Sequence, residues 1–339
     1  MIKRGLTITN KERILQSLKH QQPDHVPYNI RFTIPAHHKM VQYYHDPAFL
    51  SKLDNSICML DTHFSDREIM PDIWQDEFGV QWDRSIDKDI GVVCNCTITP
   101  ENIADYQFPD PNHLERYQSY EQKINENSDT FIMAAIGFSL FERVWTMVGM
   151  ENTLMDMLAN QNYIQQLFDG VLNYNLQIIT NVCRYAIDAV HFGDDWGQQT
   201  GLIMGPRLWR EIIKPRIKEM YQLVKSKGKF VSIHSCGKVD ELYPDLIEIG
   251  VDIFNPFQPE VIDVVDIKKR YGNKMTFWGG ISTQKTLPYG TVQETRDEVR
   301  RLLDQIGSGG GYIAAPAHDI PGDAKPENIA AMIDVLENQ

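Results

Sequence analysis

The chain has 339 residues, of which 42% are hydrophobic and 23% charged, a composition typical of a folded globular protein rather than a disordered one. Its 46 acidic residues outnumber the 33 basic ones, and the net charge of -13 opposes binding to the phosphates of nucleic acids. The first twenty residues contain no apolar signal-peptide core, and no window approaches about 18 uninterrupted apolar residues. We therefore predict a cytoplasmic protein that has neither a nucleic acid nor a membrane as partner, with its five cysteines reduced.

The N-terminal part begins with a helix signal. Thr9 and Glu12 form a Thr-x-x-Glu capping box ahead of an amphipathic run, which predicts a helix within an N-terminal extension, residues 1–22. A proline-bounded extended segment, "PDHVPYNIRF", follows it. Residues 46–111 are rich in aromatic and acidic side chains but show weak periodicity, so no elements are assigned there. We expect one domain over residues 1–339.

After Asp129 the pattern becomes a regular alternation of short apolar runs and longer helical stretches. The strand candidates are "TFIMAAIG", "DAVHFG", "KFVSIHS", "VDIFN", "MTFWGG" and "GYIAA". The helix candidates are Pro206–Lys227, Glu241–Ile249, the Thr291-capped run to Ile306, and Pro326–Leu336. Six βα units in half of the chain favour an α/β fold of the (β/α)8 TIM-barrel class, a parallel barrel with an N-terminal extension and insertions. No Gly-x-Gly-x-x-Gly opens any of these helices, so a dinucleotide site is not indicated.

Polar side chains that can carry chemistry follow the predicted strands. Because the active sites of such barrels lie at the C-terminal ends of the strands, we expect these residues around one mouth. They are Asp194, Asp195, His234, Cys236, Asn255 and His318.

The stretch "IHSCG" places two metal-binding side chain types at a strand end. His234 and Cys236 are two residues apart, so in a strand both point the same way and could face one ion. His318, at the end of the last predicted strand, is the best candidate for a third ligand. A His/Cys/His set with an open fourth position is typical of a catalytic zinc site. The alternative is that these side chains are simply packed.

Paired carboxylates follow another strand end. Like charges as close as Asp194 and Asp195 would raise one pKa, which suits general acid catalysis or contact with a cationic substrate. A solvated loop that caps the next helix is the alternative. Glu142 also follows a strand end, where it could line a pocket or simply begin a helix.

Several motifs occur in the order typical of one family. They are "HFGDDWGQQTGLIMGPRLWREIIKPRIKEM", "IHSCGKV", "FWGGIST" and "GGYIAAPAHDIPGDAKPENI". In these stretches the chain resembles the uroporphyrinogen decarboxylase superfamily, from about Pro23 to the C-terminus. The resemblance implies a (β/α)8 barrel, in agreement with the strand pattern.

That superfamily includes two chemistries, metal-free decarboxylation of a porphyrinogen and zinc-dependent methyl transfer from or to a corrinoid protein. The decarboxylases bind their carboxylate-rich substrate through N-terminal arginines, whereas here only Arg31 in "IRFTIPAHH" corresponds. Uncompensated buried carboxylates are costly, so one arginine is insufficient, and Asp194 with Asp195 would add repulsion.

The methyltransferase branch resembles this chain more closely at its metal site. His234 and Cys236 match its His-x-Cys at the strand end. Its third ligand is a cysteine, whereas His318 stands at that place here and instead matches a histidine of the decarboxylases. Imidazole is also a good zinc ligand, so the substitution hints at an unusual acceptor.

The resemblance therefore implies a zinc-dependent methyltransferase that moves a methyl group between a corrinoid protein and a small molecule. No Asp-x-His-x-x-Gly cobalamin motif is present, so the methyl-corrinoid is expected on a partner protein. Asp194 or Asp195 would orient the acceptor or relay its proton. The remaining expected site residues are His318 as a catalytic residue and Arg31, Asn255 and Glu142 as substrate-binding residues.

Two other functions remain open at this point. In the first, the protein decarboxylates a tetrapyrrole in porphyrin biosynthesis, and Arg31, Asp66 and His318 face the substrate without metal. In the second, the barrel binds a corrinoid or tetrapyrrole without turnover. The sequence names neither the methyl donor nor the acceptor, and it leaves the oligomeric state open, with a homodimer as one outcome.

Overall fold

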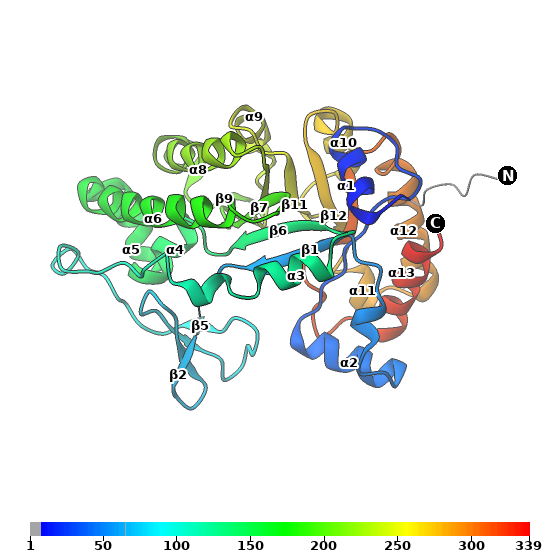
Figure 1. The fold of residues 1–339 in the computed structure, drawn as a ribbon, viewed down its shortest axis with the longest axis horizontal. Helices are drawn as coiled ribbons and strands as arrows, with labels where there is room; N and C mark the ends of the chain where they lie inside the picture. Colours follow the sequence, from blue (N-terminus) through cyan, green and yellow to red (C-terminus); the bar gives the residue numbers. More distant parts are fainter. Residues whose placement is uncertain (1–7, 65) are drawn as a thin grey trace. The chain divides into compact units, whose positions relative to one another are not determined.

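The computed structural model describes residues 8–64 and 66–339 (Figure 1). These residues belong to two compact units. The first unit comprises Met1–Cys58, Glu126–Ile132 and Asp252–Gln339, and the second comprises Met59–Asn125 and Met133–Val251. Whether residues 1–339 act as one domain stays a prediction.

Seven strands follow one another in a single sheet in their chain order, and all six strands predicted from the sequence are among them. The strand pairs β6–β7, β7–β10, β11–β12 and β12–β13 are parallel. The fold is therefore α/β and of the TIM-barrel type, as predicted. The strands are β1 (Ile57–Asp61), β6 (Phe131–Ile136), β7 (Ala189–Gly193), β10 (Phe230–His234), β11 (Ile253–Phe257), β12 (Thr276–Ile281) and β13 (Tyr312–Pro316).

The parallel strands of the second unit are buried along most of their length. Ile136 of β6 pairs in register with Phe192 of β7, which in turn pairs with Ile233 of β10, and at most 5% of each side chain is exposed. Continuous apolar runs suit strands that are covered on both faces. The same register sets Gly193 opposite His234, so β7 and β10 end level with each other.

Helices of the second unit follow and flank these strands (Figure 1). The helix predicted over residues 206–227 is present, but its first part contains a π-helical turn, Trp209–Ile213. Pro215, at the start of the next helical segment, has no N–H to donate, and a wider turn accommodates that missing bond. The α-helices are α3 (Tyr120–Glu126), α4 (Phe141–Val148), α5 (Met150–Ala159), α6 (Gln161–Val182), α7 (Gly205–Leu208), α8 (Lys214–Ser226) and α9 (Tyr243–Glu248), with 3₁₀ turns at Leu114–Tyr117 and Asp240–Leu242.

The stretch that the sequence left unassigned contains a small antiparallel sheet in the second unit. Its strands are two to four residues long, too short for a clear alternation of apolar and polar side chains. They are β2 (Arg67–Met70), β3 (Ile73–Gln75), β4 (Gln81–Asp83) and β5 (Val92–Val93). A hairpin, β8 (Gly197–Gln198) with β9 (Gly201–Leu202), follows β7.

The first unit contains the N-terminal helix and the last βα repeats. The capping box of Thr9 and Glu12 is present at the start of α1. The proline-bounded segment lies along β13, since Tyr28 pairs with Ala314 and Phe32 with Ile320 in parallel bridges. The helices of the first unit are α1 (Asn10–Leu18), α2 (Ile34–Tyr44), α10 (Val264–Tyr271), α11 (Thr286–Tyr289), α12 (Val292–Gln305) and α13 (Pro326–Glu337), with a 3₁₀ turn at Phe49–Lys52.

Within the described residues, none of the helices combines the length and the apolar character needed to cross a membrane.

Candidate functional site

The ends of β7 and β10 are joined by backbone contacts beyond the sheet itself. The N–H of Asp194 donates to the carbonyl of His234 at 2.9 Å, and the N–H of Trp196 donates to Oγ of Ser235 at 3.0 Å. Gly197 and Gly237 allow the two loops to touch, because a Cβ on Gly237 would lie 2.4 Å from the backbone of Gly197. The two polar loops therefore form one cluster of contacts in the second unit.

The two proposed zinc ligands of β10 lie side by side in this cluster. Sγ of Cys236 is 3.3 Å from Nε2 of His234. The backbone N–H of Cys236 donates to Oδ1 of Asp195 at 2.7 Å, and the same oxygen is 3.9 Å from Nε2 of His234. Both side chains thus face the same small region, as their spacing along the strand predicts.

Asp194 is fully buried and caps the start of α4. Its carboxylate accepts the backbone N–H groups of Leu140, Phe141 and Glu142 at 2.8 to 3.2 Å, and the indole N–H of Trp196 at 2.6 Å. These four bonds lower its pKa, but burial outweighs them and raises the pKa to about 6. The two aspartates therefore differ, since Asp194 holds the helix in place whereas Asp195 is about one-third exposed at 35%.

Glu142 brings a third carboxyl group into the cluster from the first turn of α4. Burial, together with the negative charges of Asp195 and Asp194, raises its pKa well above the usual value. Burial and the charges of Asp195 and Glu142 likewise raise the pKa of the Cys236 thiol. Burial and the neighbouring carboxylates thus favour the neutral forms of Glu142 and Cys236.

A metal cation fits this arrangement. Imidazole nitrogen and thiolate sulfur are preferred zinc ligands, and a divalent cation would offset the burial and the negative charges that raise the pKa of Glu142 and Cys236. His234 and Cys236 are therefore the residues of the second unit that could hold such an ion. Asp195 could support them through its bond to the Cys236 backbone.

His318, Arg31 and Asn255 lie in the first unit, and their roles stay predictions. His318 follows β13 and is exposed. Arg31 is also exposed and pairs with Asp319 at 3.2 Å. Asn255 is buried in β11, where its Nδ2 donates to the carbonyl of Trp278 at 2.9 Å.

Comparison with known proteins identifies the family. The family model "Uroporphyrinogen decarboxylase (URO-D)" matches residues 9–339. The chain belongs to the URO-D family. Curated relatives of this URO-D chain include proteins named uroporphyrinogen decarboxylase from Ruthia magnifica, 21% identical, and from Neisseria gonorrhoeae, 24% identical. These matches cover 53% and 49% of this chain and 50% and 47% of the relatives, so the chain spans about half the length of the curated relatives it matches.

A solved structure resembles the URO-D chain over nearly its whole length. A methyltransferase from Methanosarcina mazei superposes with a TM-score of 0.74, covering 98% of this chain and 99% of its own, at 15% identity. Identity this low establishes the shared fold rather than a shared activity.

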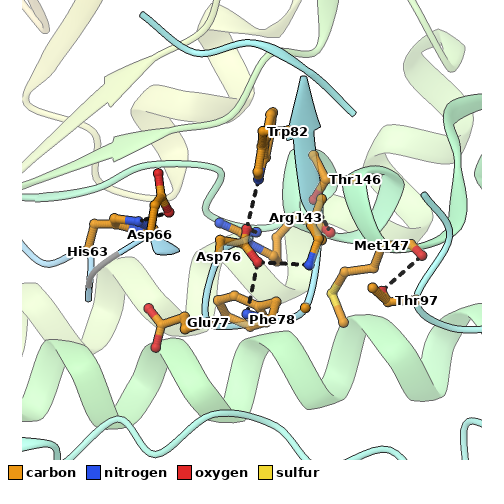
Figure 2. Close-up of polar contacts among 12 residues, drawn as sticks. His63, Asp66, Asp76, Glu77, Phe78, Trp82, Thr97, Arg143, Thr146 and Met147 are labelled. Carbon is orange, nitrogen blue, oxygen red and sulfur yellow. Dashed lines mark hydrogen bonds and ion pairs between the residues drawn. The ribbon is translucent and has the colours of Figure 1, made fainter. Parts of the chain in front are cut away.

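The structure also reveals a feature of this URO-D chain that sequence reasoning missed. A cavity of about 250 Å³ lies in the second unit beside the small antiparallel sheet, with Phe78, Trp82 and Phe138 among its lining residues. Figure 2 shows Asp76 bonded to both Trp82 and Arg143 in this region, and the His63–Asp66 pair nearby. The aromatic composition of residues 46–111 was the only available signal, because the short strands there lack periodicity.

Proposed function

We propose that this URO-D family protein is a methyltransferase, in which a zinc ion held by His234, Cys236 and His318 serves methyl transfer between a corrinoid-carrying partner protein and a small molecule. The observation that carries the proposal is the His234–Cys236 pair, 3.3 Å apart, inside a partly buried cluster of carboxyl groups. A metal-free decarboxylase has no use for that pair, whereas a thiolate-zinc site depends on it.

The donor chemistry supports the metal. The proposed set offers two imidazole nitrogens and one sulfur, a combination that zinc accepts while keeping a position open. When bound, the zinc ion supplies a Lewis acid that lowers the pKa of a thiol or similar methyl acceptor. His318 would supply the ligand that is a cysteine in the methyltransferase branch.

The residues of the cluster then have separate tasks. Asp195 holds the Cys236 backbone through a 2.7 Å hydrogen bond and, being partly exposed, would accept a hydrogen bond from the methyl acceptor. Asp194 positions the first turn of α4, and with it Glu142. Glu142 would hold a proton in the buried part of the cluster.

The relatives' names favour a second candidate, decarboxylation of a tetrapyrrole. That reaction needs cationic partners for several carboxylates of the substrate. Arg31, the arginine that could serve it, already pairs with Asp319, which weakens this candidate.

Metal content decides between the two. We expect the purified protein, loaded with zinc and dialysed, to retain about one zinc ion per chain by inductively coupled plasma mass spectrometry. His234→Ala, Cys236→Ser and His318→Ala should lose it, whereas Cys94→Ser, a change of an exposed cysteine in the same unit, should retain it. The zinc-loaded protein should also consume methylcobalamin when a thiol acceptor is supplied.

Two outcomes would contradict the proposal. One is a protein that retains no zinc after loading. The other is decarboxylation of uroporphyrinogen at an equal rate in the presence and absence of a metal chelator.

A further inference from the structure

The cavity of the second unit is walled by aromatic side chains from separate elements. Phe78 and Trp82 come from the small antiparallel sheet and its turn, and both are 5% exposed. Phe138 follows β6, and its ring centroid lies 5.1 Å from that of Trp82. Aromatic walls of this kind offer flat surfaces to a flat, apolar ligand.

The charges inside the cavity are paired with one another. Arg143 donates to Oδ2 of Asp76 at 2.7 Å, the indole N–H of Trp82 donates to the same oxygen at 3.2 Å, and the guanidinium lies 4.2 Å from the ring centroid of Phe78 (Figure 2). A buried ion pair with its hydrogen bonds made has little need of a charged ligand. The inner part of the cavity therefore suits an uncharged group.

At the rim of the cavity, two basic side chains form hydrogen bonds with one carboxylate. Asp66 accepts from Nε2 of His63 at 2.6 Å and also from Nη2 of Arg84. Nε of Arg84 donates to the carbonyl of Ile90 at 3.2 Å, and among the described residues none accepts from its Nη1. Arg84 therefore retains a donor, and the group formed by His63, Arg84 and Asp66 carries one excess positive charge when His63 is protonated.

Other carboxylates also line the cavity and set the opposite expectation. Asp61 accepts the backbone N–H of His63 at 2.8 Å, and Asp89 also lines the cavity. If these carboxylates dominated the electrostatic potential of the cavity, the cavity would prefer a cationic ligand. Binding of an anionic and a cationic probe therefore distinguishes the two expectations.

The cavity adjoins the carboxyl and thiol cluster through α4 and the loop before it. Glu142 of the cluster and Arg143 of the cavity are consecutive residues. Phe138 has a φ of +47°, a left-handed conformation that a bulky residue rarely adopts, and the N–H of Ser139 beside it donates to the carbonyl of Gly193 at 2.7 Å. The loop is thus held in place by the residue that precedes Asp194.

We propose that this cavity binds a small planar aromatic molecule that carries one anionic group, with the ring packed against Trp82 and Phe138 and the anion at Arg84 and His63. This inference rests on the proposed function, because it names the class of small molecule whose methyl group is exchanged. The volume of about 250 Å³ agrees with it, since pockets for drug-sized ligands begin at roughly 300 Å³.

Isothermal titration calorimetry with three probes tests the ligand class. Benzoate is planar and anionic, benzylamine replaces the anion by a cation, and cyclohexanecarboxylate keeps the anion but is not flat. We expect benzoate to bind more tightly than either of the other two. Preferential binding of benzylamine, or equal binding of the two acids, would overturn the proposal.

Variants test the residues. Arg84→Gln should weaken benzoate binding by about tenfold or more, because it removes a charge-assisted hydrogen bond. Asp66→Asn should bind benzoate at least as well as the unchanged protein, because it removes the competing carboxylate. Arg67→Gln, a change of an exposed arginine on the same small sheet, is the matched control and should bind normally.

Loss of binding in Asp66→Asn together with normal binding in Arg84→Gln would reverse the assigned charge and reject the proposal. Arg84→Lys guards against misfolding, since it should recover part of the affinity, and circular dichroism should confirm the fold of each variant.

The experiment also separates this inference from the proposed function. Benzoate binding is measured without methyl transfer and with zinc either present or absent. A protein that binds benzoate but retains no zinc would keep the cavity assignment and lose the methyltransferase proposal. A protein that retains zinc and transfers methyl groups but ignores benzoate would do the reverse.

Discussion

At the end of β10, Sγ of Cys236 lies 3.3 Å from Nε2 of His234. One carboxylate oxygen of Asp195, which follows β7, accepts the backbone N–H of Cys236 at 2.7 Å and lies 3.9 Å from Nε2 of His234. Groups that hold a metal ligand in place affect the metal affinity even when they do not bind the metal. The carboxylate that receives the Cys236 backbone N–H is such a group.

Asp195→Asn should therefore weaken zinc binding by about tenfold or more without abolishing it. A competition titration against a chromophoric zinc chelator measures the change. Glu241→Gln, a change of an exposed carboxylate in the 3₁₀ turn Asp240–Leu242 that follows β10, is the control. An unchanged zinc affinity in Asp195→Asn would mean that Asp195 plays no part in supporting the ligands.

Asp194→Ala should destabilise the second unit by about 3 kcal/mol, because it leaves several buried N–H groups at the start of α4 without an acceptor. Urea unfolding followed by circular dichroism measures this change in the free energy of unfolding. Glu151→Gln, in the exposed first turn of α5, should change it by less than about 0.5 kcal/mol. Equal effects of the two variants would refute the capping role.

Arg143→Met should lower the free energy of unfolding by about 3–5 kcal/mol, because it leaves the buried carboxylate of Asp76 without its cation. The two side chains are only 6% and 2% exposed, so water cannot take the place of the partner. The double variant Arg143→Met with Asp76→Leu should recover much of the loss, since no unpaired charge remains. Urea unfolding of the single and double variants provides the measurement, and a double variant no more stable than the single one contradicts the expectation.

The His63–Asp66 pair predicts a pH dependence. Burial works against the charged imidazole, but the hydrogen bond and charge of Asp66, aided by Asp61 and Glu77, outweigh it and raise the pKa of His63. A raised folded-state pKa means that the stabilisation is fully present below the unfolded value of about 6.5 and is lost as pH rises through the folded value.

The free energy of unfolding of the unchanged protein should therefore exceed that of His63→Gln by more at about pH 5.5 than at about pH 8.5. The side chain is 36% exposed, so the difference should stay near 0.5 kcal/mol. Urea unfolding at the two pH values tests it, and a difference of opposite sign would show that His63 is neutral when paired.

Local patterns in the sequence determined much of this protein. The six strands from Phe131 onward, the capping box of α1 and the cap at Thr291 of α12 appear as predicted, because apolar runs and helix caps are local features of the sequence. The side-by-side placement of His234 and Cys236 agrees with their two-residue spacing, although Cys236 lies past the end of β10 and its backbone is held by Asp195.

The tertiary structure decided the roles of the individual side chains and the position of the cavity, because both depend on which distant segments of the chain meet. Asp194 and Asp195 look equivalent in sequence, yet one caps α4 and the other remains partly exposed. The cavity near Trp82 and Phe138 could not be predicted, because its walls come from strands too short to show a pattern and from a loop distant in sequence. Local preference determines each element, whereas only long-range packing determines which side chains share a charge, a hydrogen bond or a cavity.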